Sequence, residues 1–174
     1  MVEPYFSQVY STGPVPDLRT RHRLFVDNRD RDTDVYPNPF QFTLHFDTCG
    51  VPSYNNVHSV ELKGISVPKC NNEPYVILSI DELNDNMLDA TSNVNQAYAV
   101  VYYDNNQMTP GDVRPVKGTD FYLKNVEYKP PLRRLDRLSV SIRKHDGSLV
   151  STADTGNNTN VSMLFEVISG TRST

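Results

Sequence analysis

Two histidines and one carboxylate in this sequence have the residue types of an iron site. His45 and Asp47 stand two positions apart, and His145 follows much later in the chain. Two histidines and one carboxylate form the facial triad that holds non-haem iron in oxygenases. Such enzymes also need a cation for an oxo-acid co-substrate, but the next arginine after His145 is Arg172. An iron enzyme is therefore an alternative that depends on where His45 and Asp47 point.

The residues around His45 alternate strictly between apolar and polar side chains. Phe42, Leu44 and Phe46 must share one face of a strand, because successive side chains of a strand point to opposite faces. His45 and Asp47 then take the other, solvent-facing side. Since an enclosed metal needs ligands from the barrel interior, the alternation argues against the iron site, and we expect no metal there.

A run of alternating charges before this strand has the start of a calcium-binding loop. Asp30, Asp32 and Asp34 have the spacing of the first ligands, but the sixth position lacks glycine and the twelfth, Gln41, is not glutamate. The interleaved arginines would repel a cation. We expect instead a network of ion pairs and turn hydrogen bonds, closed by the corner Tyr36-Pro37-Asn38-Pro39.

Other signatures of chemistry are weak. Nucleophile-elbow, phosphate-loop and HExxH patterns are absent, so we expect no catalytic residue and no cofactor. The two cysteines, Cys49 and Cys70, form no CxxC pair, which favours reduced thiols over a disulfide framework. Asn157 and Asn160 begin formal glycosylation sequons, and the polar stretch 151–160 predicts an exposed, mobile tip.

Length and charge set the class of protein. A chain of 174 residues with a net charge of -4 predicts one domain and gives no reason to expect direct nucleic-acid binding. Arginines cluster locally, but acids are interleaved with most of them, which is typical of a solvated, salt-bridged surface. The sequence has no apolar run long enough to span a membrane and no secretory signal pattern.

Short segments rich in β-forming residues follow one another along the chain. The first, Leu24-Phe25-Val26, precedes the charged corner, and the alternating segment 40–46 follows it. Further strands are expected at 57–67, 75–80, 97–103, 120–128, 138–142 and 161–167. His145-Asp146-Gly147-Ser148 supplies the Asp-Gly turn of a hairpin. The pattern predicts an all-β protein of about eight strands with no amphipathic helix.

Several connections are longer than simple hairpin loops, notably after Ile80, Tyr103 and Leu149. Long crossovers suit Greek-key wiring, and eight antiparallel strands in two Greek keys form a single jelly-roll sandwich. The expected core residues are Phe42, Leu44, Val60, Leu62, Ile77, Val100, Leu138, Val140, Phe165 and Val167.

The first part of the chain differs from the rest. Residues 1–22 contain proline and glycine breakers without periodicity, which predicts an extended N-terminal arm before a jelly-roll domain at 23–174. Tyr5, Phe6 and Tyr10 are the candidate partner contacts of this arm, because aromatic side chains bury much area for little lost rotamer freedom.

Three segments together resemble a known family. They are NRDRDTDVYPNPFQFTL, VHSVELKGISVPKCNNEPYVILSIDEL, and RRLDRLSVSIRKHDGSLV followed by LFEV. In this order they resemble the single jelly-roll capsid proteins of large icosahedral double-stranded DNA viruses, most closely the penton proteins at the five-fold vertices. The resemblance covers most of the chain, roughly 24–167.

The resemblance implies a structural protein of the virion, made and assembled inside the host cell, and no catalysis. It implies a homopentamer that contacts the major capsid protein and other minor capsid proteins. Two alternatives stay open: a minor capsid protein elsewhere in the shell, and a glycan-binding jelly roll on the virion surface. For the second, Tyr102 and Tyr103 beside Asp104-Asn105-Asn106 are the candidate sugar contacts.

Overall fold

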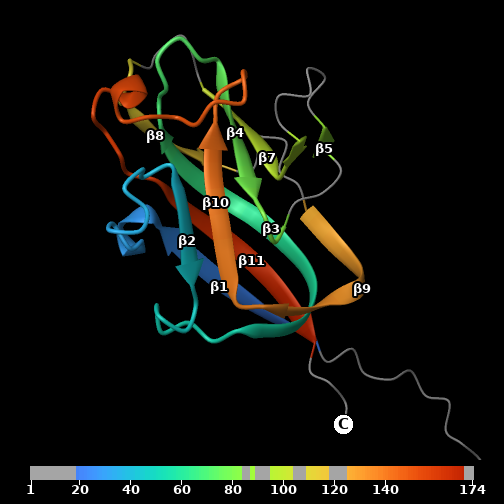
Figure 1. Ribbon diagram of the computed structural model, residues 1–174. Helices are drawn as coiled ribbons and strands as arrows, with labels where there is room; N and C mark the ends of the chain where they lie inside the picture. The colour runs from blue at the N-terminus through green and yellow to red at the C-terminus, as the bar shows by residue number, and fades with distance from the viewer. Residues whose placement is uncertain (1–18, 84–86, 89–94, 104–108, 118–124, 171–174) are drawn as a thin grey trace, which may run out of the picture.

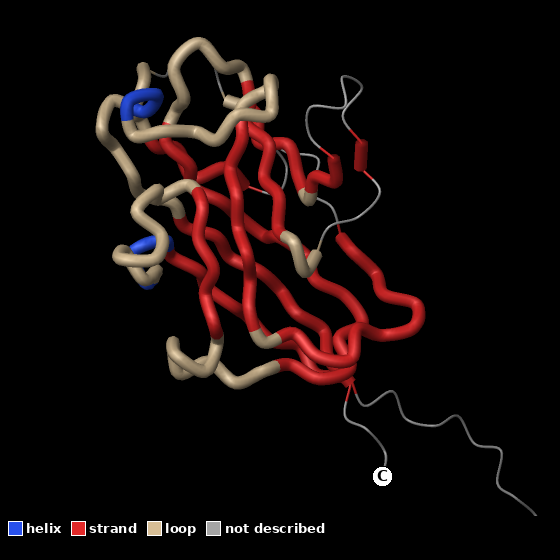
Figure 2. The backbone as a smooth tube through the Cα atoms, viewed as in Figure 1, coloured by secondary structure: helices blue, strands red, loops and turns tan. Residues whose placement is uncertain are grey.

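Two antiparallel β-sheets pack against each other as a β-sandwich in the computed structural model (Figure 1). The structure describes residues 19–83, 87–88, 95–103, 109–117 and 125–170. Figure 2 shows that these residues are mostly strands, with only two short 3-10 helices and no α-helix among them. The predicted all-β class is therefore confirmed.

The first sheet has the order β1-β11-β3-β8, and β9 also pairs with β3. Its strands are β1 (Arg19–Asp27), β3 (Tyr54–Pro68), β8 (Val113–Lys117), β9 (Asn125–Leu135) and β11 (Ser162–Gly170). The second sheet has the order β2-β10-β4-β7. Its strands are β2 (Gln41–His45), β4 (Tyr75–Ile80), β7 (Ala99–Tyr102) and β10 (Arg137–Arg143). A small third sheet pairs β5 (Met87–Leu88) with β6 (Asn95–Ala97). The 3-10 helices are η1 (Asn28–Asp30) and η2 (Ala153–Thr155).

The core lies between the two sheets, as the alternating patterns require. Eight of the ten expected core residues are buried in it: Phe42, Leu44, Val60, Leu62, Leu138, Val140, Phe165 and Val167. Burying a side chain of this size stabilises the fold by about 1.5 to 3 kcal/mol. The period-two prediction for these strands is thus confirmed.

Two core predictions are wrong in register. Ile77 is buried outside the main core, in a small cluster with Ala97, and Val100 is only half-buried. Their neighbours Val76 and Val101 take the core face instead. The reason is that β4 is apolar on both faces, so its sequence contains no alternation from which the inward face could be read.

Some predicted boundaries also move. The expected strand 97–103 divides into the end of β6 and β7, and the expected strand 120–128 corresponds to β9, which continues to Leu135. β1 begins at Arg19, so the predicted boundary after His22 falls inside a strand that pairs with β11. Residues 1–18, the rest of the proposed arm, lie outside the described residues.

The predicted Asp-Gly turn forms after β10. Gly147 has a φ of 83°, a left-handed conformation that glycine adopts without strain, and the Lys144 amide donates to the Ser148 carbonyl at 2.8 Å. The loop that follows is mostly exposed, as its composition predicts, but Thr155 within it is fully buried. The Asn158 side-chain amide also donates to the Gly111 carbonyl at 2.8 Å, which ties the loop to the segment before β8.

Candidate functional site

The charged corner between β1 and β2 connects the two sheets (Figure 1). Asp27 ends β1 and accepts a hydrogen bond from the Arg29 amide at 2.9 Å, which caps η1. The Arg29 guanidinium donates to both Asp27 carboxylate oxygens, at 2.9 and 2.6 Å. Arg31 donates to the carbonyls of Asn28 and Tyr36. The expected self-neutralising network is therefore present at the first half of the corner.

Asn28 is the buried centre of this corner. Its side-chain amide donates to the carbonyls of Pro39 and Thr159, and its side-chain oxygen accepts from the Val161 amide at 3.2 Å. The backbone of Asn28 also donates to the Val161 carbonyl at 3.0 Å. One residue thus joins the corner to the segment that leads into β11, with every polar group of its side chain satisfied.

Asp27 should make stability depend on pH. The side-chain hydrogen bond from Arg29 holds the pKa of the Asp27 carboxyl below its ordinary value of 3.8. The stabilisation is therefore fully present above pH 3.8 and is lost as the pH falls through the lowered pKa. We expect Asp27→Asn to cost roughly 0.5 to 1 kcal/mol at pH 7, since Arg29 is largely exposed, and to cost less at acidic pH.

Urea unfolding of both proteins between pH 2 and pH 7 measures this difference. Asp30→Asn is the matched control, because Asp30 is an exposed carboxylate of the same loop, and it should change the unfolding free energy by less than about 0.5 kcal/mol. An Asp27→Asn deficit that stays constant across the whole range would contradict the assigned ion pair.

The structure does not bring the proposed iron ligands together. His45 is exposed and pairs with Arg137 at the start of β10, whereas His145 follows the end of that strand. Seven strand residues separate the two ends by roughly 20 Å. His145 instead contacts the Glu73 carboxylate at 3.0 Å. No group of three or more metal-ligating side chains occurs among the described residues.

The other candidate residues lie apart from one another. Tyr102 is exposed on β7, but Tyr103 is buried and its hydroxyl donates to the Pro68 carbonyl at 2.9 Å. Residues 104–106 and the arm residues Tyr5, Phe6 and Tyr10 lie outside the described residues. Both cysteines are free; Cys49 is exposed, and burial raises the pKa of the Cys70 thiol to about 11.

An exposed apolar patch lies on the outer face of the first sheet. Phe25 on β1 is 62% exposed, the highest value among the large apolar side chains that the structure describes. It stands opposite Leu164 of β11, and Leu164 stands opposite Gly64 of β3. Because Gly64 has no side chain, Phe25 and Leu164 are the two apolar side chains of this row. β1 is also an edge strand, paired with β11 alone among the described strands.

Ion pairs flank this patch on the same sheet. Glu166 of β11 lies 3.6 Å from Arg21 of β1 and 3.7 Å from Lys63 of β3, and Lys63 also contacts Glu61 at 2.6 Å. Arg21 and Lys63 are exposed, whereas Glu166 is largely buried. A polar rim around an apolar centre is the usual anatomy of a protein–protein contact.

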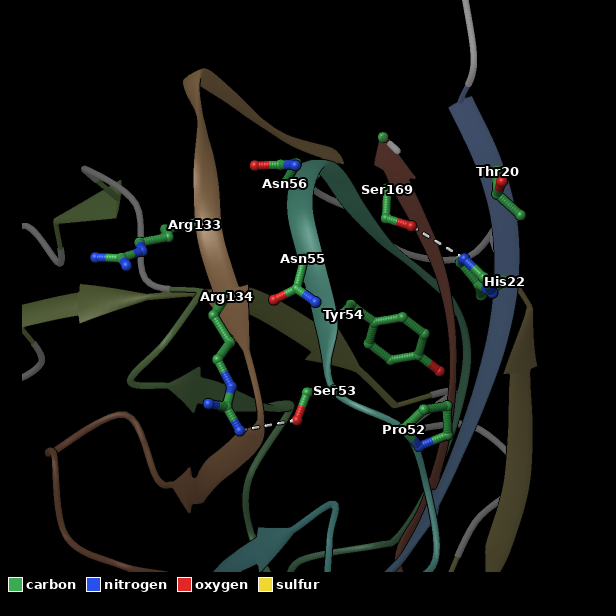
Figure 3. A pocket seen from close by; sticks show the side chains of 11 residues that line it. Thr20, His22, Pro52, Ser53, Tyr54, Asn55, Asn56, Arg133, Arg134 and Ser169 are labelled. Carbon is green, nitrogen blue, oxygen red and sulfur yellow. Dashed lines mark hydrogen bonds between the residues drawn. The ribbon is translucent and has the colours of Figure 1, made fainter. Parts of the chain in front are cut away.

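A groove of about 760 Å³ crosses the end of the same sheet (Figure 3). It lies where β1 begins and β11 ends, since Arg19 is paired with Gly170. Its walls come from β1, β3, β9 and β11 and from the segment before β3. The lining residues are Thr20, His22, Pro52, Ser53, Tyr54, Asn55, Asn56, Arg133, Arg134, Ser169 and Gly170.

The groove is lined by hydrogen-bond donors and contains no carboxylate among these residues. Arg134 donates to the Ser53 hydroxyl at 3.2 Å and contacts Asp136, just outside the groove, at 3.2 Å, so its guanidinium is held in place. His22 contacts the Ser169 hydroxyl at 3.0 Å, and its ring packs against Tyr54 (Figure 3). Burial raises the pKa of the Tyr54 hydroxyl, which keeps it a donor.

Sequence reasoning missed both the apolar patch and the groove. Phe25 appears in the sequence as part of an apolar run, although its neighbours Arg23 and Asp27 show that the run continues an alternating pattern. The adjacent arginines of β9 belong to the local arginine clusters that the sequence predicts to form a solvated surface. No local signal could have connected them to His22 and Ser53, because the groove forms only when distant strands pair.

The sequence matches no protein-family model and no curated protein. In the described part of the chain, no helix has the length and apolar character needed to cross a membrane.

Proposed function

We propose that the sandwich is a single jelly roll and that the chain is a capsid subunit, the penton at the five-fold vertices of a large double-stranded DNA virus. The strand order supports the fold. With the small β5-β6 sheet set aside and β8 and β9 taken as one position beside β3, eight positions remain. In chain order the two sheets are then 1-8-3-6 and 2-7-4-5. Two interleaved Greek keys have this arrangement.

The proposed function is supported by this strand order together with the exposed patch around Phe25. A closed ring of identical subunits needs a heterologous contact, in which one flank of a subunit binds a different flank of the next. An exposed phenylalanine beside Leu164 and Gly64, with ion pairs next to it on the same sheet, suits one such flank. The resemblance to penton proteins supplies the expected five-fold closure, and the virion as the expected location.

The first test is the mass of the purified chain. We expect native mass spectrometry to show an assembly near 98.5 kDa, five times the 19.7 kDa of one chain. Phe25→Asp should shift this species to monomers, because it places a charge in the centre of the contact. Val35→Asp is the matched control, since Val35 is equally exposed, at 61%, but lies in the corner loop.

Two results would contradict the proposal. A chain that stays monomeric at every concentration would contradict the proposal that it assembles with copies of itself. An assembly of another stoichiometry would contradict the proposal that it is a penton. Equal effects of Phe25→Asp and Val35→Asp would exclude the outer face of the first sheet as the contact. A density map of a virus particle that contains this chain, searched for the fold at its vertices, locates the subunit directly.

A glycan-binding module is the second candidate. Tyr75 and Tyr102 are paired across β4 and β7, with ring centroids 5.6 Å apart, and Tyr102 is 46% exposed. Aromatic rings on an exposed sheet face can stack on sugars. Binding of the purified chain to a glycan array, lost in Tyr102→Ala, would favour this candidate over a purely structural subunit.

A further inference from the structure

The groove at the end of the first sheet offers a binding site that the proposed ring contact does not use. We infer that it binds the N-terminal segment, residues 1–18, of a neighbouring copy of this chain. The inference rests on the proposed function in one respect only, namely that copies of the chain assemble with one another.

Charge complementarity is the first step. Residues 1–18 contain two acids, Glu3 and Asp17, and no lysine or arginine. The groove presents Arg133 and Arg134 without a lining carboxylate. Both arginines are exposed, and Arg134 is already oriented by Ser53 and Asp136. A fixed guanidinium loses little freedom when it binds a carboxylate, which favours an acidic peptide as the occupant.

The backbone chemistry of the segment is the second step. Pro4, Pro14 and Pro16 lack amide donors and favour extended backbone at the residues before them. An extended peptide presents both amide donors and carbonyl acceptors, and at the three prolines it presents carbonyls alone. The side chains of Asn55 and Asn56 and the hydroxyls along the groove supply donors for them. The segment and the groove therefore match in hydrogen bonding as well as in charge.

The position of the segment favours binding between copies. Thr20, two residues after the segment ends, already lines the groove. To enter the groove of its own chain, the segment would have to reverse direction within Pro16–Leu18, next to residues that favour extension. Eighteen extended residues can reach about 60 Å, which is far enough to reach the groove of an adjacent subunit.

A labelled peptide with the sequence of residues 1–18 tests the inference on the full chain. The host protein carries Glu3→Lys and Asp17→Lys, so that its own segment does not compete for the groove. Fluorescence anisotropy should show binding that weakens about tenfold or more when Arg133→Glu and Arg134→Glu are added. Lys129→Glu is the matched control, because Lys129 is an exposed cation of the same strand outside this groove, and it should leave binding unchanged.

A second comparison changes the peptide and keeps the same host protein. The peptide with Glu3→Lys and Asp17→Lys should bind the same host about tenfold more weakly than the natural peptide, and rising salt should remove the difference. Equal binding of the two peptides, or equal effects of the groove and control substitutions, would overturn the inference. A pentamer without peptide binding leaves the proposed function standing and removes the groove site. Peptide binding by a chain that never assembles would support the groove as a binding site and contradict the proposed function.

Discussion

Replacing Phe42 by alanine should lower the free energy of unfolding by about 3 to 5 kcal/mol. Phe42 is 1% exposed and lies in the core between the two sheets, where it is paired with Val140 of β10. The substitution removes the transfer free energy of the ring and leaves a cavity that the two sheets cannot close without shifting. A loss of this size is a large fraction of the roughly 5 to 15 kcal/mol typical of a folded domain.

The chain provides a matched control for this experiment. Phe25→Ala makes the same chemical change at a side chain that is 62% exposed, so it should cost less than about 1 kcal/mol. Both variants are compared by urea unfolding of dilute protein, so that assembly does not add to the measured stability. A Phe42→Ala loss no larger than that of Phe25→Ala would mean that β2 does not pack with the register described.

The second large effect should come from Asn28→Asp, with an expected loss of about 2 to 4 kcal/mol at pH 7. The new carboxylate would face the carbonyls of Pro39 and Thr159, which now accept hydrogen bonds from the Asn28 amide. Burying a polar group without a partner costs about 1 to 3 kcal/mol, and more when it is charged. Only the hydrogen bond from the Val161 amide would remain.

The pH dependence of this variant distinguishes lost hydrogen bonds from a general loss of packing. Burial and the two facing carbonyls should raise the pKa of the introduced carboxyl above the ordinary value of about 3.9 for aspartate. The deficit should therefore shrink as the pH falls through this raised pKa toward about 4, because the protonated carboxyl could donate to one carbonyl again. Asn55→Asp is the control, because Asn55 is exposed and its change should alter stability by less than about 0.5 kcal/mol. A deficit in Asn28→Asp that is independent of pH would contradict the assigned hydrogen bonds.

Local alternation in the sequence was sufficient to predict which side chains face the core in much of the sandwich. Phe42 and Leu44 point inward and His45 points outward, as their spacing predicts, because the pleat of a strand leaves only two faces. The same reasoning failed at Ile77 and Val100. Both lie in segments whose two faces are apolar, so either register satisfied the pattern, and only the pairing of β4 with β7 and β10 decided it.

The candidate sites depended on tertiary structure to a greater extent. The sequence by itself determined a charged corner with its arginines and aspartates, because these residues lie within a few positions of one another. That Asn28 would be buried against Pro39, Thr159 and Val161 follows only from the packing of the corner against the segment before β11. The groove likewise takes His22 and Arg134 from strands that are far apart in the sequence. Sequence spacing constrains neighbours along a strand, whereas contacts between strands are set by sheet order and register, which the whole core determines together.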